Sequence, residues 1–178
     1  MDDVVVDACR LINLCAAGEL RERLSRLGGE WHVPTVVFAE TLYLHVARAD
    51  GTIEKSLLDL RAYVEEGVLL ACTAEAGTEL ELYVDLAARL DDGEAMALAI
   101  AKTRSWTFST DDFKAKRIAN ELSITVLTTP QIMKRCAEMA KPSADKLRET
   151  LRRIELYASF FPDAKDPLHA WWRKSADD

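Results

Sequence analysis

The stretch VVVDACRLINL, residues 4–14, decides the fold class. Three consecutive valines form a short apolar run that ends at Asp7, and a helical stretch follows from Ala8 to about Ala17. A run that is apolar at every position, and not only at alternate positions, is typical of a strand buried on both faces of a parallel sheet. The stretch therefore predicts an α/β protein whose first strand, residues 3–6, lies in the middle region of the sheet.

The pattern continues outward from this strand. Further strands are expected at 35–38, 68–71, 106–109 and 124–127, and helices at 18–27, 39–49, 52–66, 78–90, 93–103 and 111–122. Strands that alternate with helices indicate parallel units with helices on both faces. We predict a three-layer α-β-α fold with a central, mostly parallel sheet of four to five strands. After Pro130 only helices are expected, at 131–140 and 144–160, with a short amphipathic segment around Trp171.

Composition limits the class of protein. The chain has 178 residues, of which 49% are hydrophobic and 30% charged, as expected for one globular domain. No apolar run is long enough to span a bilayer, and the chain opens Met-Asp-Asp where a secretory signal would carry basic residues. We therefore expect a cytoplasmic protein with no membrane segment.

The metal-binding residue types and the net charge are also informative. The four cysteines form no Cys-x-x-Cys pair and the three histidines no spaced pair, so we expect small buried cysteines and no zinc site. The net charge of −7 argues against a protein that coats nucleic acid. Its acidic excess lies in residues 1–129, where bound cations would offset part of it.

Four acids lie where a parallel α/β sheet gathers its functional residues, at the carboxyl ends of strands. Asp7 and Asp112 follow expected strands, Glu40 lies in the first turn of the helix after another, and Glu94 opens the helix at 93–101. Convergent carboxylates repel one another unless a divalent cation neutralises them. Ligand sets made only of oxygen favour Mg²⁺ or Mn²⁺, which points to hydrolysis of a phosphodiester.

Each acid also has a purely structural interpretation. Asp7, Asp111 and Asp112 occupy positions at which Asp often caps a helix. Glu40 could stabilise a helix dipole, and Glu94 could complete a capping box after Asp91 or Asp92. The ordered set, and not any one acid, points to a site.

Four segments together resemble the PIN domain, the nuclease fold of the VapC-like toxins of bacterial toxin–antitoxin pairs. They are residues 4–14, 33–44, 92–101 and 109–120, and the resemblance covers residues 1–129. It implies that Asp7, Glu40, Glu94 and Asp112 are catalytic metal ligands, with Asp112 at the Thr-x-Asp position. Asp111 would be a supporting acid, and the Thr110 hydroxyl would position water or phosphate. Residues 130–178 would form a C-terminal helical extension packed on the same domain.

The resemblance implies a Mg²⁺- or Mn²⁺-dependent endoribonuclease, the toxin of a toxin–antitoxin pair, that hydrolyses RNA. A catalytically silent PIN-like scaffold for protein binding is the alternative. A receiver domain ranks last, because it needs a lysine just after its last strand and Thr-Thr-Pro follows Leu127 here. Candidate phosphate contacts, which could equally be a solvated helix face, are Arg10, Arg104, Lys114, Lys116 and Arg117.

The expected helix at 144–160 carries an apolar face formed by Leu147, Leu151, Ile154 and Tyr157. This face either covers the domain's own core or forms an exposed docking surface with the aromatic pairs at 160–161 and 171–172. As partner we expect first a second copy of the chain in a homodimer, and second an antitoxin peptide in a groove.

Overall fold

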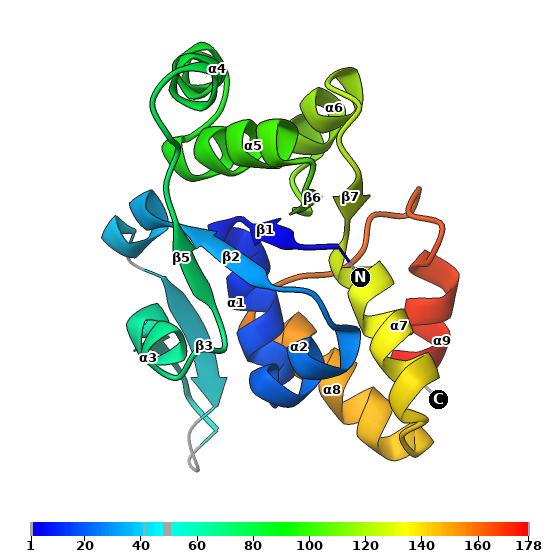
Figure 1. Cartoon of the computed structure of the whole chain (residues 1–178). Helices are drawn as coiled ribbons and strands as arrows, with labels where there is room; N and C mark the ends of the chain where they lie inside the picture. Colours follow the sequence, from blue (N-terminus) through cyan, green and yellow to red (C-terminus); the bar gives the residue numbers. More distant parts are fainter. Residues whose placement is uncertain (1, 41, 48–50, 178) are drawn as a thin grey trace. The chain divides into compact units, whose positions relative to one another are not determined.

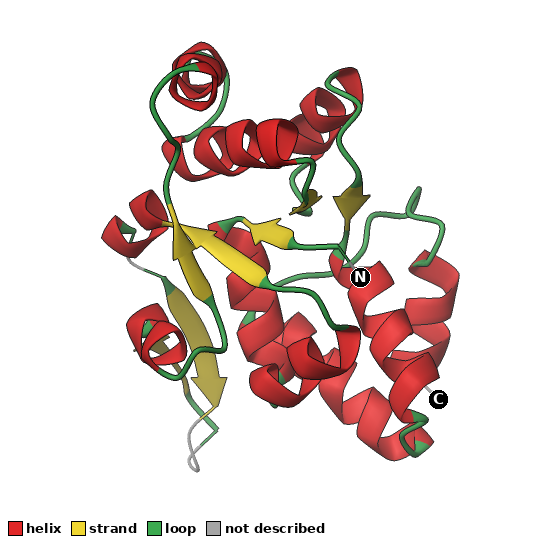
Figure 2. Cartoon of the chain, viewed as in Figure 1, coloured by secondary structure: helices red, strands yellow, loops and turns green. Residues whose placement is uncertain are grey.

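The sheet is the centre of the first of two compact units. The computed structural model describes residues 2–40, 42–47 and 51–177. Five strands form an all-parallel sheet in the order β5-β2-β1-β6-β7, flanked by helices (Figures 1 and 2). The strands are β1 (Val4–Val6), β2 (Trp31–Pro34), β5 (Leu70–Cys72), β6 (Thr107–Ser109) and β7 (Val126–Leu127). The predicted α/β fold class is confirmed, including the central place of the first strand.

The valines explain why β1 is central. All three are fully buried, and β1 pairs with β2 through Val4 and Val5 and with β6 through Val4, Val5 and Val6. β-branched side chains fill both faces of a strand that has no face toward water.

One helix, α5 (Asp92–Arg104), packs directly on the middle of this sheet. Its residues 95–101 are all buried and four of them are alanine, which lets the helix approach the strands closely. Val5 and Phe108 of the sheet join these residues in one apolar core. In Figure 1, α4 (Thr78–Ala87) and α6 (Phe113–Glu121) lie on the same side of the sheet as α5. The short helix α3 (Leu60–Glu65) precedes β5.

The second compact unit comprises residues 12–27, 42–58 and 129–178. It contains most of α1 (Ala8–Ala17), then α2 (Leu20–Leu27), the antiparallel hairpin of β3 (Tyr43–Ala47) and β4 (Ile53–Leu57), α7 (Thr129–Ala140), α8 (Ala144–Tyr157) and α9 (His169–Asp177). Its core includes Leu151 and Ile154 of α8 and the fully buried Trp172 of α9. The apolar face of α8 therefore covers the interior of this unit.

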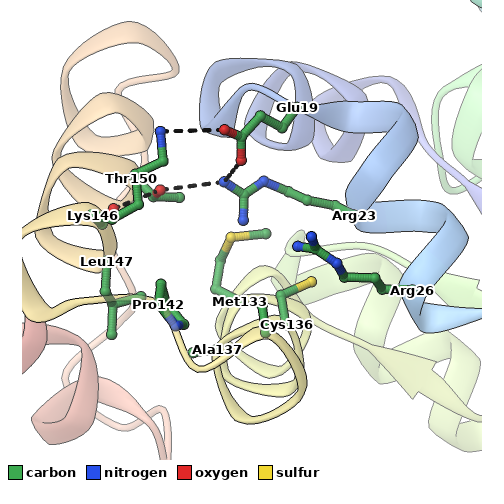
Figure 3. A pocket seen from close by; sticks show the side chains of 11 residues that line it. Glu19, Arg23, Arg26, Met133, Cys136, Ala137, Pro142, Lys146, Leu147 and Thr150 are labelled. Carbon is green, nitrogen blue, oxygen red and sulfur yellow. Dashed lines mark hydrogen bonds and ion pairs between the residues drawn. The ribbon is translucent and has the colours of Figure 1, made fainter.

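A small pocket in this unit lies between α2, α7 and α8 (Figure 3). At its rim Glu19 lies 3.4 Å from Arg23 and 3.3 Å from Lys146, and Arg23 also donates to the Thr150 hydroxyl at 3.3 Å. The Arg23–Thr150 bond joins α2 to α8, and Glu19, which precedes α2, forms ion pairs with both Arg23 and Lys146.

The expected elements between residues 31 and 66 were wrong in part. The second strand is 31–34, and residues 35–39 instead form a turn of 3-10 helix, η1 (Thr35–Ala39). The helix expected at 39–49 and the first half of that at 52–66 are the hairpin β3–β4; positions 41 and 48–50 lie outside the described residues. Cross-strand pairing outweighs weak local helix propensity here. Among the described helices, none combines the length and apolar character needed to cross a membrane.

Candidate active site

Asp7 is the most buried acid of the sheet's carboxyl edge. It follows β1 directly and is 2% exposed. Its Oδ1 accepts the Arg10 backbone N–H at 2.7 Å, which caps the first turn of α1. Its buried Oδ2 has no hydrogen-bond partner in the part of the chain that the structure describes. Burial raises the pKa of Asp7 to about 6, although Arg10 and the Thr110 hydroxyl act to lower it.

Glu94 lies in the first turn of α5, where Asp91 forms the cap. The Glu94 N–H donates to Asp91 Oδ1 at 2.8 Å, as the capping interpretation predicted. Burial, followed by the charges of Asp91, Asp112 and Asp7, raises the pKa of Glu94 to about 7. The negative charges of these three acids therefore disfavour the ionised form of Glu94.

Glu40 approaches the same helix from η1. It ends the 3-10 turn, with its backbone N–H donating to Val37 O at 3.1 Å, so its expected place in a helix first turn was wrong. Its Oε1 lies over Gly93: a Cβ on that glycine would be 2.7 Å from Glu40 Oε1. Burial first, then Asp91, Asp7 and Asp92, raise the pKa of Glu40.

The loop after β6 supplies two adjacent acids with different partners. Asp112 caps α6, since its Oδ1 accepts the Ala115 N–H at 2.7 Å, and its charge raises the pKa of Glu94. Asp111 instead pairs with Arg10 at 2.6 Å. The fully buried Thr110 accepts the Asp112 N–H at 3.1 Å and so holds the loop in a tight turn.

Arg10 is an internal cation. Its side chain is fully buried and donates to Ser109 Oγ at 2.9 Å, Asp111 Oδ2 at 2.6 Å and Leu127 O at 3.0 Å. These bonds join the ends of β6 and β7 to the start of α1. The expectation that Arg10 contacts RNA phosphate is therefore corrected, because its guanidinium group does not reach the surface.

The other expected phosphate contacts divide into two groups. Arg104 ends α5, about 18 Å along the helix from its acidic start, and pairs with Glu79 at 2.7 Å. It therefore lies away from the acids. Lys114, Lys116 and Arg117 are on α6, which Asp112 caps, and Arg117 lies 3.6 Å from Glu121. These three remain candidate phosphate contacts.

Two residues near the acids were missed from the sequence. Cys9 is exposed, whereas we expected buried cysteines throughout; Cys15, Cys72 and Cys136 are buried. Cys9 is exposed as a residue, but its sulfur is partly shielded from water; this partial burial, followed by the charges of Asp7, Glu94, Asp91 and Glu40, raises the pKa of the thiol to about 12. Asp91, which we considered only as a cap, is the strongest charge acting on both Glu40 and Glu94.

The four proposed ligands therefore share one electrostatic environment. No three acids of this edge, among residues the structure describes, bring ligand atoms within 4.8 Å of one another. The unpartnered Asp7 oxygen and the raised pKa values of Asp7, Glu40 and Glu94 are the features expected where a hard cation would relieve repulsion. The residues present fit Mg²⁺ or Mn²⁺.

Comparison with protein families gives the relationship directly. A family model described as a PIN domain matches residues 3–161, most of the chain. The chain belongs to the PIN-domain family. PIN domains are generally nucleases and typically use divalent metal ions. The PIN match continues past residue 129 through α7 and α8. Comparisons with curated proteins and with solved structures gave no match.

Proposed function

We propose that this PIN-domain protein is a metal-dependent endoribonuclease. The observation that carries the proposal is the buried carboxyl group of Asp7. Its Oδ2 has no hydrogen-bond partner among the described residues, and its charge raises the pKa values of Glu40 and Glu94. A buried carboxylate whose oxygen accepts no hydrogen bond destabilises the folded protein unless a cation or a proton neutralises its charge. Evolution toward stability alone would favour an apolar or hydrogen-bonded residue at this position.

The proposed metal ligands are Asp7, Glu40, Glu94 and Asp112. A bound Mg²⁺ or Mn²⁺ would orient a phosphodiester and stabilise the negative charge that develops on it. The chain itself fixes the ligands: the α1, α5 and α6 caps hold the backbones, and Gly93 leaves room for the Glu40 carboxylate. Arg10 pairs with Asp111, and Asp112 is the acid of that loop whose charge raises the pKa of Glu94.

Cleavage of total RNA by the purified chain tests the proposal. Wild-type protein should cut RNA internally with Mg²⁺ or Mn²⁺ and should stop when EDTA is added. Asp7→Asn keeps the capping acceptor and should lose at least 100-fold in rate. Asp85→Asn, on the exposed side of α4, is the matched control and should cut like the wild type. Folded wild-type protein that leaves every RNA intact would favour the silent scaffold.

A role as a toxin is a finer proposal on the same site. Expression of the wild type in bacteria should arrest growth, and Asp7→Asn should not. Active nuclease in cells that grow normally would remove the toxin role but leave the nuclease.

We also propose that the chain forms a homodimer. The hairpin exposes three apolar side chains, Tyr43 (41%), Ile53 (54%) and Leu57 (65%). Tyr43 and Leu57 are direct cross-strand partners, and Ile53 lies on the same face as Leu57 by strand alternation. Exposed apolar patches commonly mark interfaces.

Light scattering tests the dimer. The wild type should give twice the 19.9 kDa chain mass, and Leu57→Glu should give the monomer while Glu54→Gln does not. A monomer for the wild type would leave the antitoxin peptide as the partner for this face.

A further inference from the structure

A second group of metal-ligating side chains lies at the opposite edge of the same sheet. Asp3 directly precedes β1, Glu30 directly precedes β2, and His32 is the second residue of β2. One ligand atom of each lies within 4.8 Å of the other two. Over residues 2–40, 42–47 and 51–177 this is the one three-residue group with such spacing. Asp3 and Asp7, which flank β1, are four positions apart along this strand, or about 13 Å.

The strand register brings the three side chains to one face. Val5 pairs with His32, so Asp3, two residues before Val5, lies on the same face as His32, and so does Glu30. Two bonds fix the backbones: Val4 N–H donates to Glu30 O at 2.8 Å, and Glu30 N–H donates to Asp3 Oδ1 at 2.9 Å. The cluster is thus built by the pairing of two central strands.

His32 supplies the independent evidence for a ligand. It is 7% exposed, and its buried Nε2 has no hydrogen-bond partner in the described structure. That nitrogen lies 3.7 Å from Glu30 Oε2, which is too far for a hydrogen bond. The imidazole ring stacks on Trp106 with 4.0 Å between centroids and 19° between planes. The stacking therefore fixes the orientation of the His32 ring. Its buried Nε2, an atom that normally forms a hydrogen bond, has no such bond within the described structure.

We propose that Asp3, Glu30 and His32 bind one divalent transition-metal ion, with Zn²⁺ the best fit. One imidazole nitrogen and two carboxylates suit zinc, and the two negative charges balance its charge. Bonds of about 2.0–2.2 Å at tetrahedral angles place ligand atoms about 3.3–3.6 Å apart, close to the 3.7 Å between His32 and Glu30. The exposed Glu30 side chain leaves a fourth position open to water.

Such an ion would clamp the amino ends of β1 and β2 together. It differs in chemistry from the Mg²⁺ or Mn²⁺ proposed at the carboxyl edge, where every ligand is oxygen. The sequence did not predict it, because His32 has no histidine or cysteine partner along the chain and the two acids reach it only through strand pairing.

The three histidines of the chain allow a direct test by NMR of the imidazole groups. Full-length protein is titrated with Zn²⁺ in excess Mg²⁺, which occupies the carboxyl edge. The His32 resonances should shift and saturate at one equivalent, while those of His45 and His169 stay in place. Stationary His32 resonances at saturating Zn²⁺ would overturn the proposal.

Calorimetry on variants supplies the second arm. Glu30→Gln removes a ligand from an exposed position and should weaken Zn²⁺ binding at least tenfold. Glu81→Gln, an equally exposed acid on α4, should bind like the wild type. His32→Phe keeps an aromatic ring against Trp106, so it should fold, lose the site and gain no thermal stability from Zn²⁺. Equal Zn²⁺ affinity in Glu30→Gln and Glu81→Gln would also overturn the proposal.

Discussion

At the scale of single residues, the site is defined by acids whose charges are incompletely compensated. One Asp7 oxygen accepts a helix-cap hydrogen bond and the other has no hydrogen-bond partner within the described part of the chain, and the pKa of Glu94 is raised to about 7. The fully buried Arg10, by contrast, forms an ion pair with Asp111 at 2.6 Å. The two cases lead to different predictions. Ionised Asp7 is costly in the metal-free protein, whereas Arg10 and Asp111 stabilise each other.

For Asp7 the prediction concerns stability without metal. Its folded-state pKa of about 6 exceeds the ordinary value of 3.8, so its contribution to stability is fully present below pH 3.8 and is lost as the pH rises through 6. In EDTA, the free energy of unfolding of the wild type should fall between pH 4 and pH 8 by about 1–3 kcal/mol more than that of Asp7→Asn. Urea unfolding at pH 4, 6 and 8 measures this, and equal pH slopes in the two proteins would contradict it.

For Arg10 the prediction separates structure from RNA binding. Arg10→Ala removes the buried cation that pairs with Asp111 and donates to the Leu127 carbonyl, and should cost about 3–5 kcal/mol in urea unfolding. Arg117→Ala, at an exposed position on α6, should cost less than about 0.5 kcal/mol. An Arg10→Ala protein as stable as Arg117→Ala would mean that Arg10 does not hold the edge together.

At the scale of elements, the sequence predicts those strands and helix ends that depend mainly on residues close together in the chain. The strand at 4–6 and the helix caps at Asp91 and Asp112 could be predicted in this way. The hairpin β3–β4 was not, because its stability comes from pairing between strands and its sequence has only weak local preference. The exposure of Cys9 and the grouping of His32 with Asp3 and Glu30 depend on strand and helix placement, so sequence could not reveal them.

The start of α5 gives a prediction about how an element positions a side chain. Ala is about 1 kcal/mol better than Gly within a helix, so Gly93→Ala should not destabilise the protein greatly. The new Cβ would, however, lie 2.7 Å from Glu40 Oε1 and displace the flexible carboxylate. We expect at least a tenfold loss of RNA cleavage at unchanged thermal stability. Full activity in Gly93→Ala would show that the observed Glu40 position is not needed.

Helix α8 gives a prediction about the C-terminal segment. Leu151 is fully buried and Leu156 of the same helix is 49% exposed. Leu151→Ala should cost about 2–5 kcal/mol in urea unfolding, and Leu156→Ala less than about 0.5 kcal/mol. Equal, small costs would mean that the apolar face of α8 does not cover a core.

At the scale of the whole molecule, a net charge of −7 has to be reconciled with the proposed nuclease function. Cations bound at the carboxyl edge would offset part of the charge where a phosphate must approach, and Lys114, Lys116 and Arg117 lie on the helix that Asp112 begins. RNA binding by this chain should therefore depend on the divalent ion more than on a broad basic surface.

The rate of cleavage of one labelled RNA as a function of Mn²⁺ concentration tests most directly whether the carboxyl-edge acids bind the ion that cleavage requires. Wild type and Glu94→Gln are compared, since the charges of Asp91, Asp112 and Asp7 all raise the pKa of Glu94. We predict that Glu94→Gln needs at least tenfold more Mn²⁺ for half-maximal cleavage, because it lacks one ligand. Identical Mn²⁺ dependence in the two proteins, or cleavage that persists in EDTA, would contradict the account.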